Sequence, residues 1–505
     1  MTTNIDVKVV IIGAGIAGLS VARKLVEVEG FAVSEILLLE AQDYIGGRIK
    51  QNTTFLPGVK VDLGAELLHG KGHELHQIAL ENNVKLTDLF CWAHGDGGPD
   101  DKLVNGKQFG MYYSAFRESF IPFDSEEPPF VRLNEALWNL ANMDESEAAA
   151  KMSLGDYLKS SGVDEPEMVS MAEAGFANTL CSTTEKLSLR QVIRWSRLWG
   201  DGEEEGDSRP ESSFAFIIDH LLKGPHSTDL RERVQLNTVA ASIQFNDNGT
   251  SVTVSTALSS SPSAFSGTIN AERCVVTASA EVMKRRLIQF VPELPSKLQD
   301  VFSNMDFHNA VKVVASFRRR PWPENLDGMI MAGTPIPEIW FHDHVESREG
   351  NNGATCFATA FLTSEYAEKL WSERADMSQE DIPLQVLAKQ LDAMFSHLRP
   401  EHLPDGHSLA IAGASNLPSA VEEYVNGFVW DWAKDGGVYI SGGYATTRAG
   451  VDADTIPLLS RSYFNERLFF AGEATNMPGA TAQAALESGV RVSCQIGKLR
   501  RTGTA

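Results

Sequence analysis

The chain has 505 residues with ordinary apolar (43%) and charged (22%) fractions, which exclude a chain that is disordered, collagen-like or coiled-coil throughout. At about 150 residues per domain, this length indicates roughly three domain-sized units. Lys and Arg number 44 and Asp and Glu 67, so the formal net charge is −23. That charge disfavours nucleic acid and anionic lipid as partners and weakly favours cationic ligands. Apolar stretches are too short to span a membrane.

The five cysteines lie far apart without a CxxC pair, which disfavours a disulfide framework and a zinc site. His342 and His344 lack a third ligand at metal-site spacing, so we predict no metal. The chain shows no recognised targeting signal. We therefore expect a cytoplasmic protein, and the sequence does not indicate its oligomeric state.

The first elements form a strand–helix–strand unit, with an apolar strand at Val7–Ile12, a helix at Ile16–Val28 and a second strand at Ile36–Leu39. This is the size of one βαβ unit. We then expect a helix at Leu75–Leu89 and a loop at His94–Gln108. Residues 131–223 are expected to be mostly helical, interrupted by an acidic, solvated loop at Asp201–Asp207.

The second half of the chain begins with four predicted strands, Val234–Leu236, Ala240–Phe245, Ser251–Ala257 and Cys274–Thr277, with Ser259–Ser266 as a loose hairpin tip. Further along we predict a strand at Val311–Phe317 and a helix at Thr363–Leu398. The last two predicted elements are a strand at Leu468–Phe470 and a helix at Ala482–Leu499. The pattern predicts an α/β protein. Its discontinuous Rossmann-like nucleotide domain comprises 1–80, 230–300 and 425–505, and an inserted α+β substrate domain comprises 81–229 and 301–424.

A glycine motif, Gly13-Ala14-Gly15-Ile16-Ala17-Gly18, stands between the first strand and the first helix. Gly13 permits a tight turn, Gly15 lets the backbone approach a pyrophosphate, and Gly18 lets the helix pack on the strand. The phosphates would bind at the N-terminus of the helix, whose first residues are Ile16 and Ala17. Glu40, followed by Ala41, ends the second strand and can accept both ribose hydroxyls. The motif therefore predicts a dinucleotide without a 2′-phosphate.

A second glycine pair, Gly46-Gly47-Arg48, and the segment Gly64-Ala65-Glu66 follow at short intervals. Backbone donors plus a guanidinium suit a pyrophosphate that is held permanently, which favours FAD over NAD. Together with the first motif and Glu40, this order of motifs resembles the flavin-containing amine oxidase family, which includes monoamine oxidases, polyamine oxidases and flavin histone demethylases.

The resemblance covers most of the chain and implies further FAD contacts. It places the backbone of Val239 near the adenine, the carboxylate of Glu473 (after Gly472) near the ribityl and phosphate groups, and Trp432 near the dimethylbenzene edge. The helix that starts at Thr481 and Ala482 would point its positive end at the flavin. The position at which monoamine oxidases carry a flavin-linked cysteine is Val438, so FAD is expected to be non-covalent.

The resemblance also implies the catalytic residues. Lys312, which stands in an apolar strand, would contact flavin N5 through a water, and it would either assist reoxidation by O2 or position that water. Tyr439 would be one of two aromatic rings over the flavin, while Thr481 takes the place of the second ring and leaves that cage half open. His69 is the sixth residue of the segment Gly64–Gly70. Polyamine oxidases have a similar segment whose sixth residue lies in the amine tunnel, so the resemblance implies that His69 contacts the substrate.

These features predict an FAD-dependent amine oxidase, closest in pattern to polyamine oxidases, with a small cationic amine and O2 as its partners. A primary or secondary amine would pass hydride to flavin N5, the imine would hydrolyse to an aldehyde plus an amine, and O2 would reoxidise the flavin to give H2O2. Alternatives are an L-amino acid oxidase, an oxidase of the protoporphyrinogen or carotenoid type and a non-catalytic binding protein on the same fold. A histone demethylase is disfavoured because the sequence shows no long charged helical hairpin.

Overall fold

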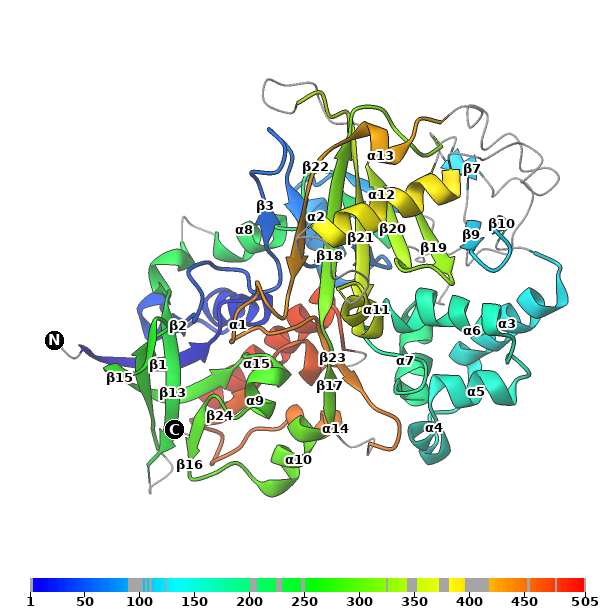
Figure 1. Cartoon of the computed structure of the whole chain (residues 1–505). Coiled ribbons are helices and arrows are strands. Elements are labelled where there is room, and N and C mark those ends of the chain that lie inside the picture. The colour runs from blue at the N-terminus through cyan, green and yellow to red at the C-terminus, as the bar shows by residue number, and fades with distance from the viewer. Residues whose placement is uncertain are drawn as a thin grey trace.

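The structure is a computed structural model that describes residues 3–89, 103–104, 107–108, 111–122, 125–199, 207–223, 229–246, 250–323, 326–342, 352–371, 381–395, 417–451, 455–476 and 479–503. Two large β-sheets form its centre, and a group of helices lies beside the second sheet (Figure 1). Segments from both ends of the chain meet in the first sheet and in the helices that cover it.

The first sheet has the strand order β12-β2-β1-β15-β14-β13-β16, and β24 pairs with the end of β15. Its strands are β1 (Thr3–Ile12), β2 (Ile36–Leu39), β12 (Val234–Gln235), β13 (Thr238–Phe245), β14 (Val252–Leu258), β15 (Ser261–Val276), β16 (Gln289–Val291) and β24 (Leu468–Phe470). β1 runs parallel to β2 and to β15, and β24 runs parallel to β15. The carboxyl ends of these four strands therefore share one edge, as in a Rossmann-like domain, and the predicted fold class is confirmed.

Both faces of this sheet are buried, which explains the unbroken apolar run at the end of β1. Val9 and Ile11 pack on one face, and Val10 and Ile12 pack on the other. The first face is covered by α1 (Ile16–Glu27), α2 (Glu74–Glu81), α8 (Phe216–Leu222) and α15 (Ala482–Thr502), and the second by α9 (Ala280–Lys284), α10 (Ser296–Asn304) and α14 (Thr455–Leu459).

The second sheet has the order β10-β9-β19-β20-β21-β18-β22. Its strands are β9 (Met111–Ser114), β10 (Ser119–Pro122), β18 (Ala310–Phe317), β19 (Gly328–Ala332), β20 (Glu338–His342), β21 (Cys356–Thr363) and β22 (Tyr424–Asp431), and nearby helices are α11 (Ser364–Lys369), α12 (Asp381–Phe395) and α13 (Ala420–Glu423). Val311 and Val313 pack with the apolar side chains of α12. Because side chains alternate along a strand, Lys312 lies on the opposite face.

The remaining helices are α3 (Pro128–Trp138), α4 (Glu147–Lys151), α5 (Leu154–Ser160), α6 (Pro166–Ala172), α7 (Leu189–Trp199), a π-helical turn (Glu173–Ala177) and 3₁₀ turns at Val33–Glu35, Asn139–Asn142, Leu230–Arg233 and Glu473–Thr475. Short strands form small sheets from β3 (Gln51–Asn52) with β4 (Val61–Asp62), β7 (Leu103–Val104) with β8 (Lys107–Gln108), β17 (Met305–Phe307) with β23 (Ala445–Thr447), and β5 (Leu68–His69) and β6 (Leu86–Leu89) on either side of β11 (Asp207–Pro210). None of the helices that the structure describes is both long and apolar enough to cross a membrane.

Three expected elements differ from the structure. The helix predicted over Leu75–Leu89 ends at Glu81, because Leu86–Leu89 instead pairs with β11. Asp207, expected at the end of a solvated loop, is buried in β11, while the rest of that loop lies outside the described residues. The predicted Ser-rich hairpin tip is mostly strand, with its turn at 259–260.

Two other predictions fall partly on residues outside those described. The helix expected over Thr363–Leu398 corresponds to α11 and α12 with a stretch between them that is not described. The loop expected over His94–Gln108 is described only at β7 and β8, which pair with each other.

The predicted division of the chain into two domains stays a prediction. It begins the last segment of the nucleotide domain at residue 425, whereas β22 pairs with β18 over the whole of Val311–Phe317, so the second sheet extends to Asp431. It also assigns α8 to the substrate domain, whereas α8 packs on the first sheet.

We expect Gly489→Ala to destabilise the protein. Gly489 lies where α15 crosses α1, and an added Cβ would come within 2.6 Å of the Ser20 Cβ and 2.7 Å of the Ala17 carbonyl oxygen. Overpacking of this kind costs about 1–3 kcal/mol of unfolding free energy, which denaturant titration can measure. Cys494→Ala, at an exposed position of the same helix, is the control, and equal stability of the two variants would contradict the packing argument.

Candidate active site

A long cleft with about 1910 Å³ of empty space, part of it open to solvent, runs between the two sheets. One end is lined by the loops that follow β1 and β2 and by the start of β13. The other end is lined by β18, β20 and residues from the helical region, including Thr179 and Trp195. A ligand in the cleft would therefore contact both sheets.

The glycine loops that follow β1 and β2 meet each other where they line the cleft. Gly15 forms an isolated β-bridge with Gly46, and no side chain caps the N-terminus of α1. A Cβ at Gly64 would overlap the carbonyl oxygen of Arg48, so that position requires glycine. The uncapped N–H groups at the start of α1 are donors suited to a phosphate.

Arg48 joins this loop region to the C-terminal end of the chain. Its Nη1 lies 2.9 Å from Glu473 Oε1 and donates to the Gly443 carbonyl oxygen at 2.6 Å. Among the described residues, the second oxygen of Glu473, Oε2, is buried without a hydrogen-bond partner. Because a buried carboxylate oxygen needs a donor, this atom fits a ligand that supplies a hydroxyl group there, as the ribityl chain of FAD would.

Glu40 lies at the carboxyl end of β2, as the sequence predicts. Its two oxygens accept the backbone N–H groups of Ala14 at 2.7 Å and Gln42 at 2.8 Å, and burial raises its pKa. Each oxygen keeps a lone pair that can accept a ribose hydroxyl. Val239 and Ala41 line the same end of the cleft, so the residues expected around adenosine lie together.

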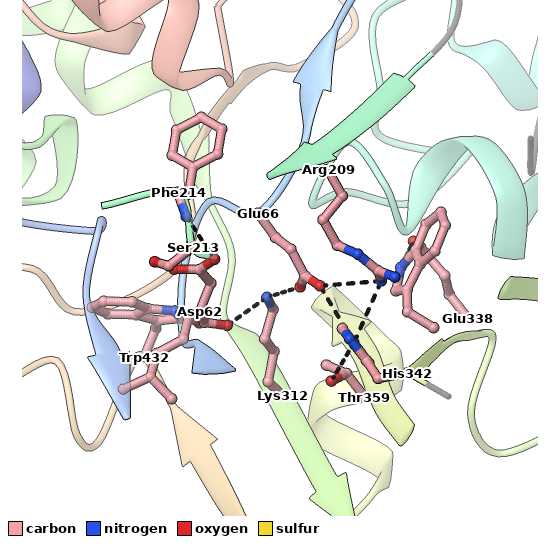
Figure 2. A network of polar contacts seen from close by, with 12 residues as sticks. Asp62, Glu66, Arg209, Ser213, Phe214, Lys312, Glu338, His342, Thr359 and Trp432 are labelled. Atoms are coloured by element: carbon pink, nitrogen blue, oxygen red, sulfur yellow. Dashed lines mark hydrogen bonds and ion pairs between the residues drawn. The ribbon is translucent and has the colours of Figure 1, made fainter. Parts of the chain in front are cut away.

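Lys312 lies at the opposite end of the cleft, on the face of β18 that points away from α12. It is 4% exposed, and its Nζ donates to the Asp62 carbonyl oxygen at 2.8 Å and to Glu66 Oε2 at 2.6 Å. Glu66, which the sequence predicts to contact the cofactor, pairs with this lysine through its carboxylate, and its contact with the cofactor stays a prediction. Figure 2 shows both contacts beside Trp432, whose indole N–H donates to the Leu63 carbonyl oxygen.

Glu338 stands in the same cross-strand row as Lys312, because Phe361 of β21 is the register partner of both residues. Its carboxylate accepts hydrogen bonds from Trp340 Nε1 at 2.8 Å, Asn178 Nδ2 at 3.1 Å and Thr179 Oγ1 at 3.4 Å. Burial nevertheless raises its pKa to about 7. Because that value is close to neutrality, the cleft contains a carboxyl group that titrates at physiological pH.

His69 forms a second polar pair in the cleft. Its Nδ1 lies 2.9 Å from Asp207 Oδ1, and its ring meets Trp195 edge-on. Burial by itself lowers the histidine pKa, but the Asp207 carboxylate outweighs that effect and the net pKa is raised. His69 and Asp207 are also register partners in the small sheet of β5 and β11, so the fold fixes this pairing.

Two expected flavin neighbours lie at the start of α15 and in the turn after β22. Thr481 is the N-cap of α15 and accepts the Ala484 N–H at 3.0 Å. Its side chain is therefore used to begin the helix whose positive end faces the cleft. Tyr439 is partly buried, and burial raises its pKa. Both residues line the cleft, but their roles toward flavin and substrate stay predictions.

The structure brings together the predicted site residues with one exception. Gly18 does not line the cleft, and a Cβ there would overlap the Gly13 carbonyl oxygen, so it serves helix packing as expected. The following predicted residues all line the cleft: Gly13, Gly15, Ile16, Ala17, Glu40, Ala41, Gly46, Gly47, Arg48, Gly64, Ala65, Glu66, His69, Val239, Lys312, Trp432, Tyr439, Gly472, Glu473, Thr481 and Ala482.

Sequence reasoning missed several lining residues, namely Thr179, Trp195, Glu338, Trp340, Phe361 and Tyr444. For Glu338 a signal existed: like Lys312, it is a charged residue in a strand with apolar neighbours. The hydroxyl of Tyr444 donates to the Thr179 carbonyl oxygen, and burial raises its pKa well above 10. It lies only five residues after Tyr439, and nothing in the sequence distinguishes the surroundings of the two tyrosines.

Relatives at the sequence level include polyamine oxidases and homologues of lysine-specific histone demethylase 1; homolog 2 of Oryza sativa subsp. japonica is 26% identical over 509 residues, which cover 97% of this chain and 56% of that protein. Polyamine oxidase 7 of Oryza sativa subsp. japonica is 26% identical over 327 residues, which cover 63% of this chain and 64% of that protein, slightly less than two thirds of its length. Probable polyamine oxidase 4 of Arabidopsis thaliana is 26% identical over 519 residues, which cover 99% of this chain and 89% of that protein.

Structural and family comparisons agree with this similarity. Wild-type putrescine oxidase bound to putrescine matches with a TM-score of 0.71 at 15% identity, covering 98% of this chain and 99% of that one, so the two share a fold. The family model described as flavin containing amine oxidoreductase matches residues 16–497. That match spans both sheets and both ends of the cleft, so the resemblance found in the sequence is confirmed and this chain belongs to the flavin containing amine oxidoreductase family.

Proposed function

We propose that the protein is an FAD-dependent oxidase of cationic amines and that its substrate is a diamine or polyamine. One observation carries the proposal: a buried carboxyl group, Glu338, lies in the same cleft and the same cross-strand row as Lys312. An amine oxidised near the lysine could then place a second, charged amino group against the carboxylate.

The chain's own residues supply the binding determinants for FAD. The start of α1 and the Gly46–Arg48 loop would hold the pyrophosphate, Glu40 the ribose, and Glu473 the ribityl hydroxyls. Of the described residues that line the cleft, none is a cysteine, which supports non-covalent binding. When bound, FAD would accept hydride from the carbon next to the amine nitrogen and pass the electrons to O2, which yields H2O2.

The cleft's apolar side chains determine which nitrogen can react. The reacting amine must be uncharged because only a free nitrogen lone pair can assist hydride loss, and the ring of Trp432, beside Lys312 in the cleft (Figure 2), disfavours a charged nitrogen by desolvation. At the other end of the substrate, ionised Glu338 favours an ammonium group. This contrast suits a molecule with two amino groups. A putrescine oxidase of the same fold is named for a diamine of this type.

Two rival functions are less well supported. An L-amino acid oxidase is expected to bind the substrate carboxylate with an arginine, but the arginine among the described lining residues, Arg48, pairs with Glu473. Arg209 approaches from β11 but lies 3.7 Å from Glu66 and does not line the cleft. A non-catalytic binding protein would have no use for a buried lysine, whose burial is costly.

The primary test is a visible spectrum followed by a peroxide-coupled screen. We expect flavin absorbance in the purified protein and H2O2 production with putrescine, spermidine, spermine or acetylated polyamines. Aryl amines and L-amino acids should react at least about tenfold more slowly, since their recognition lacks a charge pair worth about 1.5–3 kcal/mol. A colourless protein would contradict the proposal, and preferential oxidation of amino acids would favour the rival oxidase.

Lys312→Met should retain flavin but slow reoxidation by O2 roughly 10²-fold, because it removes a positive charge from the reacting region. Stopped-flow mixing of the reduced variant with oxygenated buffer measures this rate. The control is Lys369→Met, an exposed lysine of α11 for which we expect the wild-type rate. Wild-type kinetics for Lys312→Met would show that the lysine was wrongly assigned.

Glu338→Gln should lower kcat/KM for putrescine roughly tenfold or more, while kcat/KM for butylamine, which lacks the second amino group, changes about threefold at most. In the wild type, KM for putrescine should fall as pH rises through about 7, where Glu338 ionises. Glu423→Gln, a buried glutamate that pairs with Arg319 outside the cleft, is the control. Equal losses for both amines would contradict a role in binding the second amino group.

The raised pKa of Glu338 also leads to a prediction about the stability of the protein. Its pKa of about 7 exceeds the ordinary value of 4.5, so between these values the folded protein holds a proton that the unfolded chain has released. Its contribution to stability is therefore lost as pH rises through about 7. Glu338→Gln should gain on the order of 3 kcal/mol relative to wild type between about pH 4.5 and pH 8. Denaturant titrations at both pH values measure the gain, and a constant difference would contradict the shifted pKa.

A further inference from the structure

Lys312 belongs to a network of charged side chains drawn from four separate segments (Figure 2). Glu66 lies at its centre and uses its two oxygens differently. Oε2 accepts the Lys312 Nζ at 2.6 Å, while Oε1 lies 3.7 Å from Arg209 Nη1 and 3.6 Å from His342 Nε2. The carboxylate therefore stands between two cations that would otherwise face each other.

From this geometry we infer that Glu66 is a positioning residue for Lys312: it holds the ammonium group in place and directed into the cleft. The inference deepens the proposed function and rests on it. A lysine ammonium has three N–H donors, and two of them are used by the Asp62 carbonyl oxygen and Glu66. The third remains for the cleft, which Lys312 lines.

The other groups around Lys312 do not replace Glu66. The Asp62 carboxylate accepts hydrogen bonds from the Ser213 hydroxyl at 2.6 Å and the Phe214 N–H at 2.8 Å, and burial raises its pKa to about 6. It is the Asp62 backbone carbonyl, not this carboxylate, that contacts the lysine. Glu338 is separated from Lys312 by the width of β21.

The remaining neighbour, His342, is held uncharged. Burial lowers its pKa well below 6.5, and Arg209 and Lys312 lower it further. Its ring stacks on Phe357 with centroids 4.0 Å apart, which fixes its place beside Glu66. The local charges are therefore Lys312 and Arg209 against Glu66. Without Glu66, two cations would face each other in a largely buried site with no carboxylate between them, which is unfavourable.

The inference predicts a sign reversal in thermal stability, measured on the full-length protein as purified at about pH 8. Lys312→Met should lower the melting temperature in the wild-type background, because it separates a buried ion pair, and raise it in the Glu66→Gln background, because there it removes an unpaired buried charge. Equal shifts in both backgrounds would overturn the inference. This measurement needs no turnover, so it separates failure of the inference from failure of the proposed oxidase.

The functional readout is the rate of flavin reoxidation by O2 after reduction with dithionite, measured at about pH 8. Glu66→Gln should slow this rate, and Glu66→Asp, which keeps the carboxylate, should restore most of it. Adding Glu66→Gln to Lys312→Met should cause no further loss, because no ammonium group is then left to position. A merely structural role of Glu66 would slow reoxidation equally in both backgrounds, and that result would overturn the inference.

Discussion

Four parallel strands that end at one edge of the first sheet are the constraint on which the rest of the site depends. β1, β2, β15 and β24 are held in register by backbone hydrogen bonds. The residues that follow them, Gly13, Glu40, Thr277 and Gly472, all line one cleft. Parallel strands need long crossover connections, which is why a single cofactor site gathers segments from both ends of the chain.

The second sheet contributes chemistry through the alternation of its side chains. One face of β18 packs against α12 and is apolar, whereas the other face presents Lys312 to the cleft. The same alternation on β20 presents Glu338 and His342. Charged groups on a buried face are costly unless they are paired, and here each has a partner from a neighbouring segment. The sheet thus provides rigid positions, and the loops provide the compensating charges.

The proposed function places two opposite electrostatic requirements on the cleft. A site for an uncharged amine needs desolvation, which disfavours ions, while a site for a second amino group needs a carboxylate. The proposed positions of the two amino groups are separated by the width of one strand, since Phe361 lies between Lys312 and Glu338. The structure also isolates the lysine charge by pairing it with Glu66 rather than with Glu338. The carboxyl group proposed to meet substrate therefore does not have to neutralise the lysine as well.

The sequence by itself determined the local motifs: the glycine loop after β1, Glu40 at the end of β2, the isolated Lys312 and the family resemblance. These are short-range patterns, in which residue type and spacing already specify the backbone conformation. Only the tertiary structure decided the partners. The Leu86–Leu89 segment became a strand because β11 pairs with it, Asp207 became buried because that pairing encloses it, and Glu66 contacted Lys312 rather than only lining the cofactor region. Each of these outcomes depends on contacts between residues more than a hundred positions apart, for which a single sequence carries no local signal.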